Sequence, residues 1–134
     1  MKRMGFFIDE SCMLHDVGPT HPESPNRILA IETQLQKNGL KDDLYHFQIQ
    51  PAQKKQLTRA HRHQYIEDIF NIANTAKKLK SLDPDTAIGP GSLEAALAAS
   101  GAGCQAVDAI IDGKIDRAFC AVRPPGHHAE SAQA

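Results

Sequence analysis

The sequence predicts an α/β protein with a mostly parallel sheet and flanking helices, and three observations predict it. Short apolar runs near both ends of the chain, residues 5–9 and 118–122, are typical of buried strands. Between them, apolar residues recur at steps of three and four, the spacing of helices. The predicted order is strand, helix, strand, helix, helix, strand, which favours parallel strands joined by helices.

The first part of the chain supplies the first strand, a loop and the first helix. Residues 5–9 predict the strand, and residues 10–24 lack a helical or strand period, which indicates a loop. Ser24 is suited to cap a helix that has Pro25 in its first position. Gly39 can close that helix in the left-handed conformation. One apolar face of the helix consists of Ile28, Ile31 and Leu35.

The remainder supplies two strands and two helices. Residues 44–49 alternate weakly and predict the second strand. The apolar period predicts a helix over residues 62–79, with Lys77, Lys78 and Lys80 suited to its C-terminus. Ser92 is suited to cap a helix that runs to about Asp112, and its Ala, Gly and Ser residues allow close packing on a sheet. Residues 118–122 form the last predicted strand.

Composition excludes several classes of function. The 134 residues carry a net charge of −1, so neither nucleic acid nor an anionic membrane is expected as a partner. No apolar stretch approaches the ~20 residues of a membrane span, and the N-terminus does not resemble a secretory signal. Three cysteines at unrelated spacings indicate reduced thiols, and we expect a cytoplasmic protein.

Two loops carry histidines, and both follow strands. If the strands are parallel, the loop with His15 and His21 and the loop over residues 123–128 leave the sheet at the same edge, where ligands bind in such folds. His127 and His128 follow a rigid Pro-Pro-Gly turn. Adjacent imidazoles can act as a coupled general acid and base. They could also be metal ligands, or loop histidines with no catalytic task.

Three other clusters are less specific. The segment from His21 to Arg27 is stiffened by two prolines and is either a structural entry loop or part of an active site. The residues Asp83-Pro84-Asp85-Thr86 fit a turn better than a cation site. The basic residues around His61 and His63 indicate a solvated face.

Several motifs together resemble one family in their order and spacing. They are His21-Pro22-Glu23-x-Pro25-x-Arg27, His61-x-x-x-Tyr65, Asp83-x-Asp85-Thr86 ahead of Ser92, and Arg123-Pro124-Pro125-Gly126-His127-His128-Ala129. This pattern resembles the zinc-dependent histone deacetylases, whose bacterial relatives include acetylpolyamine amidohydrolases and acetoin-utilisation proteins. The Arg-Pro-Pro-Gly form is similar to the class II branch. The resemblance covers essentially the whole chain.

The resemblance implies a fold, an activity and roles for residues. The fold would be the arginase/deacetylase α/β domain, with residues 1–134 as its N-terminal part and only its first three strands present. The activity would be removal of acetyl groups from acetyl-lysine or an acetylpolyamine by metal-activated water. His128 would be the general base and later the acid, and His127 its oriented, charge-stabilising partner. Arg27 would line an internal channel through which acetate leaves, Gly126 would be a substrate-binding or channel residue, and Asp83 or Asp85, with Asp83 preferred, would hold the substrate backbone.

The family's zinc ligands do not match any residue of this sequence. We therefore expect zinc only in the complete enzyme and expect this chain alone to be inactive. An unpaired third strand would leave an apolar edge, so we expect the chain to associate with itself. The alternative is a non-catalytic module of the same fold that acts by association with another protein. An arginase-like site with two manganese ions is disfavoured, because no group of Asp and His residues has the required pattern.

Overall fold

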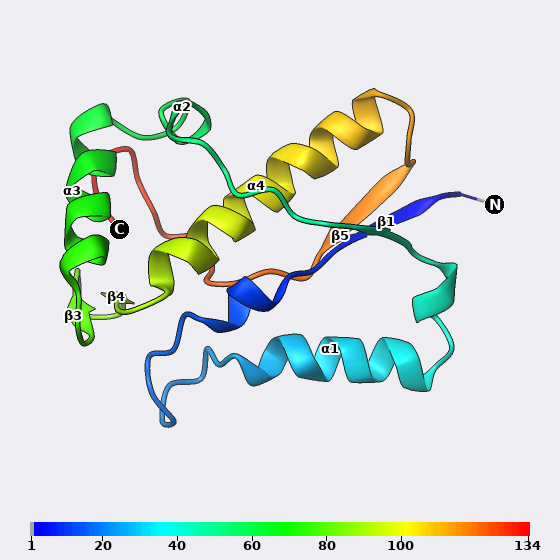
Figure 1. Ribbon diagram of the computed structural model, residues 1–134, viewed down its shortest axis with the longest axis horizontal. Coiled ribbons are helices and arrows are strands. Elements are labelled where there is room, and N and C mark those ends of the chain that lie inside the picture. The colour runs from blue at the N-terminus through cyan, green and yellow to red at the C-terminus, as the bar shows by residue number, and fades with distance from the viewer. Residues whose placement is uncertain (1) are drawn as a thin grey trace.

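A parallel three-stranded sheet forms the centre of the molecule (Figure 1), a computed structural model that describes residues 2–134. Strand β1 (Met4–Phe7) lies in the middle, between β2 (Tyr45–Phe47) and β5 (Arg117–Cys120). Both neighbours pair with β1 in parallel. The predicted α/β class and parallel strands are therefore confirmed, although each strand is shorter than the run that predicted it.

Three longer helices lie within residues 2–134, namely α1 (Asn26–Lys37), α3 (His63–Thr75) and α4 (Ser92–Ile111). Helix α4 packs on the sheet, and α3 stands apart from the sheet and contacts α4. The sequence did not predict the short helical turns η1 (Glu10–Met13), η2 (Lys41–Asp43) and α2 (Lys54–Leu57), or the antiparallel hairpin of β3 (Lys80–Ser81) and β4 (Ala87–Ile88). Within the described residues, no helix has the length and apolarity needed to cross a bilayer.

Helix α4 packs on one face of the sheet through small side chains. Its buried residues meet Phe7 of β1 and Ile115, which precedes β5, in a single cluster. The helix side of this cluster consists of Ala98, Ala102, Ala106 and Ala109. Because alanine keeps the helix axis close to the strands, the alanine-rich centre of this helix packs as the sequence predicted. Figure 1 shows α4 running alongside β5 and β1.

The opposite face of the sheet is aromatic. Phe6 is fully buried there, with His46 edge-on at 5.5 Å between ring centroids and Phe119 at 5.6 Å. Its neighbour Phe7 points to the α4 side, where it stacks on Phe47 at 4.7 Å. This alternation is the period of two expected of a strand, and both faces of β1 are buried.

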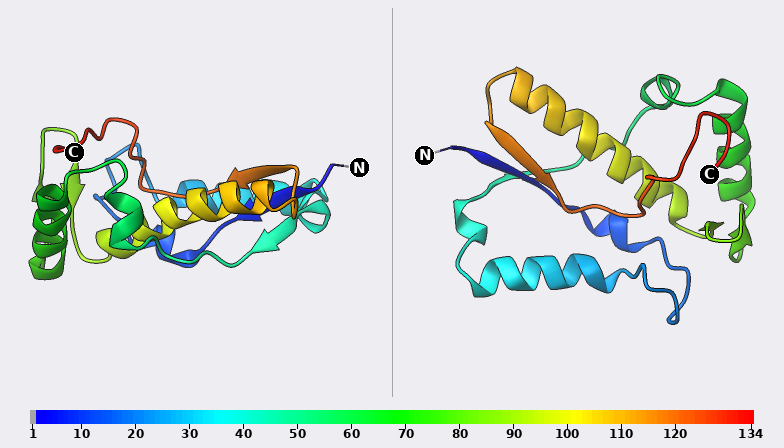
Figure 2. Two further views of the ribbon diagram at one scale, coloured as in Figure 1. Left: turned by 90° about the horizontal axis from the view of Figure 1, so that it is seen from above. Right: turned by 180° about the vertical axis from the view of Figure 1, so that it is seen from behind.

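The α3 region stands at one end of the molecule beside the C-terminal segment (Figure 2). The backbone N–H of Arg62 donates to the carbonyl of Ser131 at 2.7 Å, and His61 Nδ1 lies 2.8 Å from the carbonyl oxygen of Glu130. The segment that follows the tandem histidines is therefore held against the start of α3.

The end of α3 differs from the prediction. The helix ends at Thr75 instead of residue 79, and Ala76 is extended. The Thr75 hydroxyl donates to the carbonyls of Asn71 and Ile72, which satisfies groups left open at the helix terminus. The lysines expected in the last turn lie beyond the helix, and Lys80 pairs in the β3–β4 hairpin instead. The apolar period would allow the helix to continue to residue 79, but the chain leaves the helix at Thr75 and pairs as β3 with β4 instead.

Two helix starts also differ by a residue. Helix α1 begins at Asn26 with Pro25 at the cap, and Ser24 Oγ accepts a hydrogen bond from Asn26 N at 3.3 Å. Helix α4 begins at Ser92 itself, because Gly91 takes the cap position with φ of 80°. Ser92 is therefore free for another contact, described below. The predicted left-handed Gly39 after α1 is confirmed, with φ of 65°.

Two glycines of α4 provide a matched test of how closely this helix packs on the segment around Gln50 and Ala52. A Cβ on Gly101 would run into the carbonyl oxygen of Gln50 and lie 2.8 Å from Ala52 N, whereas a Cβ on Gly103 meets nothing within 4 Å. We expect Gly101→Ala to lower the free energy of unfolding by about 1–3 kcal/mol. Gly103→Ala should raise it by about 0.5–1 kcal/mol, because alanine favours helix. Urea unfolding measures both, and a Gly101→Ala chain as stable as Gly103→Ala would contradict the packing.

Candidate active site

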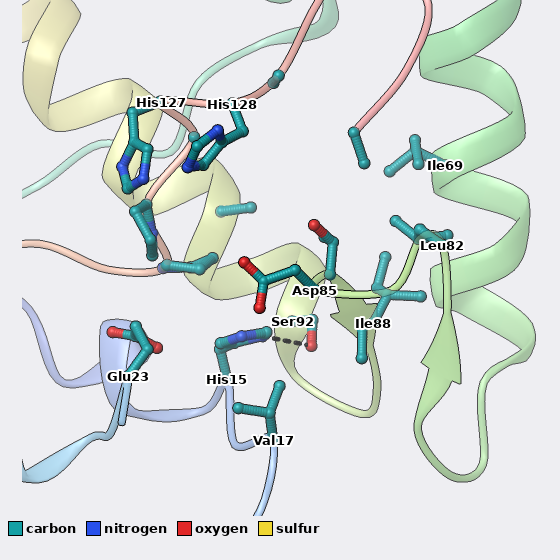
Figure 3. A pocket seen from close by; sticks show the side chains of 18 of the residues that line it. His15, Val17, Glu23, Ile69, Leu82, Asp85, Ile88, Ser92, His127 and His128 are labelled. Atoms are coloured by element: carbon teal, nitrogen blue, oxygen red, sulfur yellow. Dashed lines mark hydrogen bonds between the residues drawn. The ribbon is translucent and has the colours of Figure 1, made fainter. Parts of the chain in front are cut away.

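A cavity of about 370 Å³ lies where the two histidine loops converge. The loop after β1, the β3–β4 hairpin, the start of α4, helix α3 and the segment after β5 all line it (Figure 3). The expectation that both loops face one crevice is confirmed. The titratable side chains in its lining are His15, His21, Glu23, Tyr65, Asp85, His127 and His128.

Arg123, at the start of the tandem-histidine motif, fixes the loops to each other. Its side chain is fully buried, and its guanidinium donates to both carboxylate oxygens of Glu23, at 2.9 and 2.6 Å. It also donates to the carbonyl of Cys12 at 2.8 Å and to the carbonyl of His15. One side chain thus ties the segment after β5 to three points of the segment between β1 and α1.

Glu23 is ionised in this arrangement. Partial burial alone would raise the pKa of Glu23, but the hydrogen bonds and positive charge of Arg123 outweigh burial and hold that pKa below its ordinary value. Two-point pairing between a guanidinium and a carboxylate is among the stronger and more directional polar contacts. The pair therefore fixes the orientation of the loop that continues into Pro124 and Pro125.

The tandem histidines lie next to each other at the cavity. The ring centroids of His127 and His128 are 4.3 Å apart with planes inclined by 58°, and both residues are exposed. Figure 3 shows the two imidazoles across the cavity from His15 and Val17. A pair this close can pass a proton to a molecule in the cavity while the second ring holds charge.

His15 and Ser92 form a buried polar contact on the opposite wall. His15 Nδ1 lies 2.8 Å from Ser92 Oγ, and both residues line the cavity. Burial lowers the pKa of His15, and the positive charge of Arg123 lowers it further. His15 is therefore a neutral imidazole at neutral pH.

The other predicted site residues lie around this centre. Gly126 lines the cavity, and a Cβ at that position would meet nothing within 4 Å. Arg27 lies outside the cavity lining, with Nη2 donating to the carbonyl of Val122 at 2.7 Å and 3.8 Å from Glu23. Asp83 occupies the hairpin turn, where its carboxylate accepts from Asp85 N at 2.8 Å. Asp85, and not Asp83, contributes to the cavity lining.

Two features of the site were not found from the sequence. Arg123 and Ser92 both belong to the sequence motifs, but the motifs predict neither the anchoring role of Arg123 nor the contact of Ser92 with His15. A buried arginine side chain needs hydrogen-bond partners, so the position of Arg123 directly after an apolar strand could have indicated that it binds another segment. Nothing in the sequence indicates that Ser92 contacts His15, because the contact depends on how α4 packs.

The described residues do not make up a metal site by themselves. Within residues 2–134, no group of three or more His, Cys, Asp and Glu side chains is arranged to hold a metal ion. A catalytic zinc site needs about three protein ligands. The residues present therefore do not fit the zinc that the resemblance implies.

The fold and the site together define an α/β domain with an enzyme-like cavity at the edge of a parallel sheet. Comparison with known proteins gives the family. Residues 21–134 match the model of the histone deacetylase domain. The chain therefore belongs to the histone deacetylase family, a family of deacetylases and amidohydrolases.

Individual relatives agree with this membership. The chain is 33% identical over 150 residues to the histone deacetylase-like amidohydrolase of Pseudomonas aeruginosa, covering 99% of this chain and 39% of that protein. It is 30% identical to a probable deacetylase of Archaeoglobus fulgidus, covering 94% of this chain and 35% of that protein. Human polyamine deacetylase HDAC10 is 29% identical, over 84% of this chain and 17% of its own length.

A solved structure confirms the fold. The crystal structure of the HDA15 HD domain superposes with a TM-score of 0.89 at 23% identity, over 99% of this chain and 38% of that chain. The predicted deacetylase-like fold is thus confirmed. The chain spans about two fifths of the length of the Pseudomonas relative.

Proposed function

We propose that this chain is part of a zinc-dependent deacetylase that hydrolyses an acetamide on lysine or on a polyamine, giving acetate and a free amine. The observation that carries this proposal is the pair of adjacent imidazoles at the cavity in a chain of the histone deacetylase family. The zinc ligands would belong to the part of the family domain that this chain does not span.

The tandem histidines move the proton in this proposal. His128 accepts a proton from the water that attacks the amide carbonyl and returns it to the amine nitrogen as the carbon–nitrogen bond breaks. His127 stays oriented beside it and stabilises the developing charge. The Arg123–Glu23 pair supports both roles, because it anchors the backbone three residues before Gly126.

Three further residues have proposed roles around the substrate. Asp85 is better placed than Asp83 to accept hydrogen bonds from the substrate backbone, because its side chain is in the cavity lining. Gly126 leaves space beside the histidines. Arg27 donates to the carbonyl of Val122, the residue before the Arg123–Ala129 motif. This position is compatible with the proposed channel for acetate.

The substrate class is tested by comparing two acetamides. The complete protein should hydrolyse either an N-acetyl-lysine peptide or N-acetylputrescine, and the ratio of kcat/KM values identifies which one it prefers. The named relatives include a histone deacetylase-like amidohydrolase and a polyamine deacetylase, which supports testing both acetamides. Failure to hydrolyse either acetamide would overturn the proposed activity.

A second proposal concerns the 134-residue chain on its own, which we propose associates with itself. Within the described sheet β5 is an edge strand, and Phe119 on it is 40% exposed. Apolar residues of α4 are exposed as well, namely Val107, Ile110 and Ile111. An unpaired apolar edge is a template for strand pairing between chains. Sedimentation velocity should show dimers or larger species, and a monomer over a hundredfold concentration range would contradict association.

We also propose a cytoplasmic location. The support is the three cysteines, which are all free in the structure. Fractionation of the source cells with an antibody to the complete protein tests this proposal, and recovery outside the cytoplasm would overturn it.

A further inference from the structure

The Nε2 atom of His15 faces the cavity and has no hydrogen-bond partner among residues 2–134. The residue is 7% exposed, and its only side-chain hydrogen bond among the described residues joins Nδ1 to Ser92. No buried side-chain nitrogen or oxygen of the described residues lacks a hydrogen-bond partner. Nε2 is therefore not enclosed in protein. Because His15 lines the cavity, the accessible space at Nε2 is the cavity.

Ser92 determines which nitrogen of His15 carries the proton. Ser92 Oγ accepts a hydrogen bond from Gly89 N at 2.9 Å, and Ser92 is only 4% exposed. The serine hydroxyl has one proton, and the single acceptor within reach among the described side-chain contacts is His15 Nδ1. Ser92 therefore donates to Nδ1, and a neutral His15 carries its own proton on Nε2. The cavity wall thus presents an N–H donor.

The orientation of this donor is fixed from two sides. The carbonyl of His15 accepts a hydrogen bond from the buried guanidinium of Arg123, which fixes the backbone. The ring is held by Ser92, and Ser92 by the backbone N–H of Gly89, which lies between β4 and α4. A donor held in this way loses little conformational entropy when a ligand binds.

We propose that His15 is a substrate-binding residue whose Nε2–H donates a hydrogen bond to a carbonyl oxygen of the bound substrate. This proposal rests on the proposed function, because the substrate is taken to be an acetamide or the peptide that carries it. The charges in the cavity favour a neutral acceptor over an anion. The Glu23 carboxylate is paired with Arg123, whereas the Asp85 carboxylate lines the same cavity and disfavours a further negative charge there.

Two substitutions distinguish the role of His15 Nε2 from that of His15 Nδ1. His15→Asn places an amide near the position of Nδ1, where it can still bond to Ser92, and leaves no group at the position of Nε2. His15→Gln reaches the position of Nε2 with an N–H donor. In the complete protein, KM for an N-acetyl-lysine peptide should rise about three- to tenfold in His15→Asn, the effect of one neutral hydrogen bond. KM should rise less in His15→Gln than in His15→Asn, because Gln keeps the donor at the Nε2 position but loses the contact with Ser92 that orients it. The kcat value should stay the same in both variants, because the contact is present before the chemical step.

Nitrogen-15 spectra of the complete protein give a readout that does not depend on turnover. The His15 resonances should show a proton on Nε2 and none on Nδ1, and adding the N-acetyl-lysine peptide should shift Nε2 more than Nδ1. Ser92→Ala should move proton population toward Nδ1. A proton on Nδ1 in the parent protein would overturn the assignment of the donor.

The outcomes separate this proposal from the proposed function. If the parent protein hydrolyses the peptide and His15→Asn has the KM of the parent, the role of His15 is wrong and the proposed function stands. Equal rises in KM for His15→Asn and His15→Gln would also overturn the role, because they would indicate a merely structural residue. A parent protein that neither binds nor hydrolyses the peptide overturns both.

Discussion

Replacing His128 with asparagine in the complete protein should lower kcat by about 10²–10⁴-fold, the contribution of a general acid–base group. The imidazole is exposed at the cavity, so its removal leaves the core and the Arg123 anchor unchanged. Asparagine cannot accept a proton from water at neutral pH. Steady-state deacetylation of an N-acetyl-lysine peptide measures the loss, and circular dichroism verifies the fold.

A histidine outside the cavity provides the control for this experiment. The His63 side chain is 75% exposed at the start of α3 and is absent from the cavity lining. His63→Asn should have kcat within about twofold of the parent, because substitutions of exposed residues outside a site usually change stability by no more than about 0.5 kcal/mol. If His128→Asn retained the activity of the His63→Asn variant, His128 would not be the proton-transfer group.

Replacing Arg123 with methionine should lower the free energy of unfolding by about 3–5 kcal/mol. The substitution leaves the partly buried Glu23 carboxylate without its counter-charge, and the carbonyls of Cys12 and His15 lose their donor. An unpaired buried polar group costs more than the net value of the contact that it made. The loss is therefore expected although methionine fills most of the same volume.

The matched control for Arg123 is Arg59, an exposed arginine in the turn after α2. Arg59→Met should change stability by no more than about 0.5 kcal/mol. Urea unfolding of the two variants beside the parent gives both values. Equal stabilities for Arg123→Met and the parent would show that the buried guanidinium does not hold the two loops together.

The features predicted correctly from the sequence depend on local patterns. The apolar run around Phe6 and Phe7 indicates a buried strand, and the Ala-, Gly- and Ser-rich stretch from Ala95 to Gly103 indicates a helix packed close to the sheet. Both signals are visible within a few residues. Parallel pairing then follows from the order of the elements. The convergence of the two histidine loops follows in turn, because parallel strands end at one edge.

The features that were missed depend on contacts between distant residues. Arg123 and Glu23 are 100 positions apart in the sequence, and His15 and Ser92 are 77 apart. Spacing along a chain carries no information about such pairs until the packing of α4 and the sheet is known. The β3–β4 hairpin was missed for another reason. Its strands contain two residues each, too few to show an alternating pattern.

The most direct test of the proposed function is to quantify both products formed by the complete protein from an N-acetyl-lysine peptide. One acetate should form for each free lysine amine, and the rate at which both products form should fall by about 10²–10⁴-fold in His128→Asn. Release of amine without acetate, or no reaction by the parent protein under conditions where it is folded, would contradict the assignment of this cavity to deacetylation.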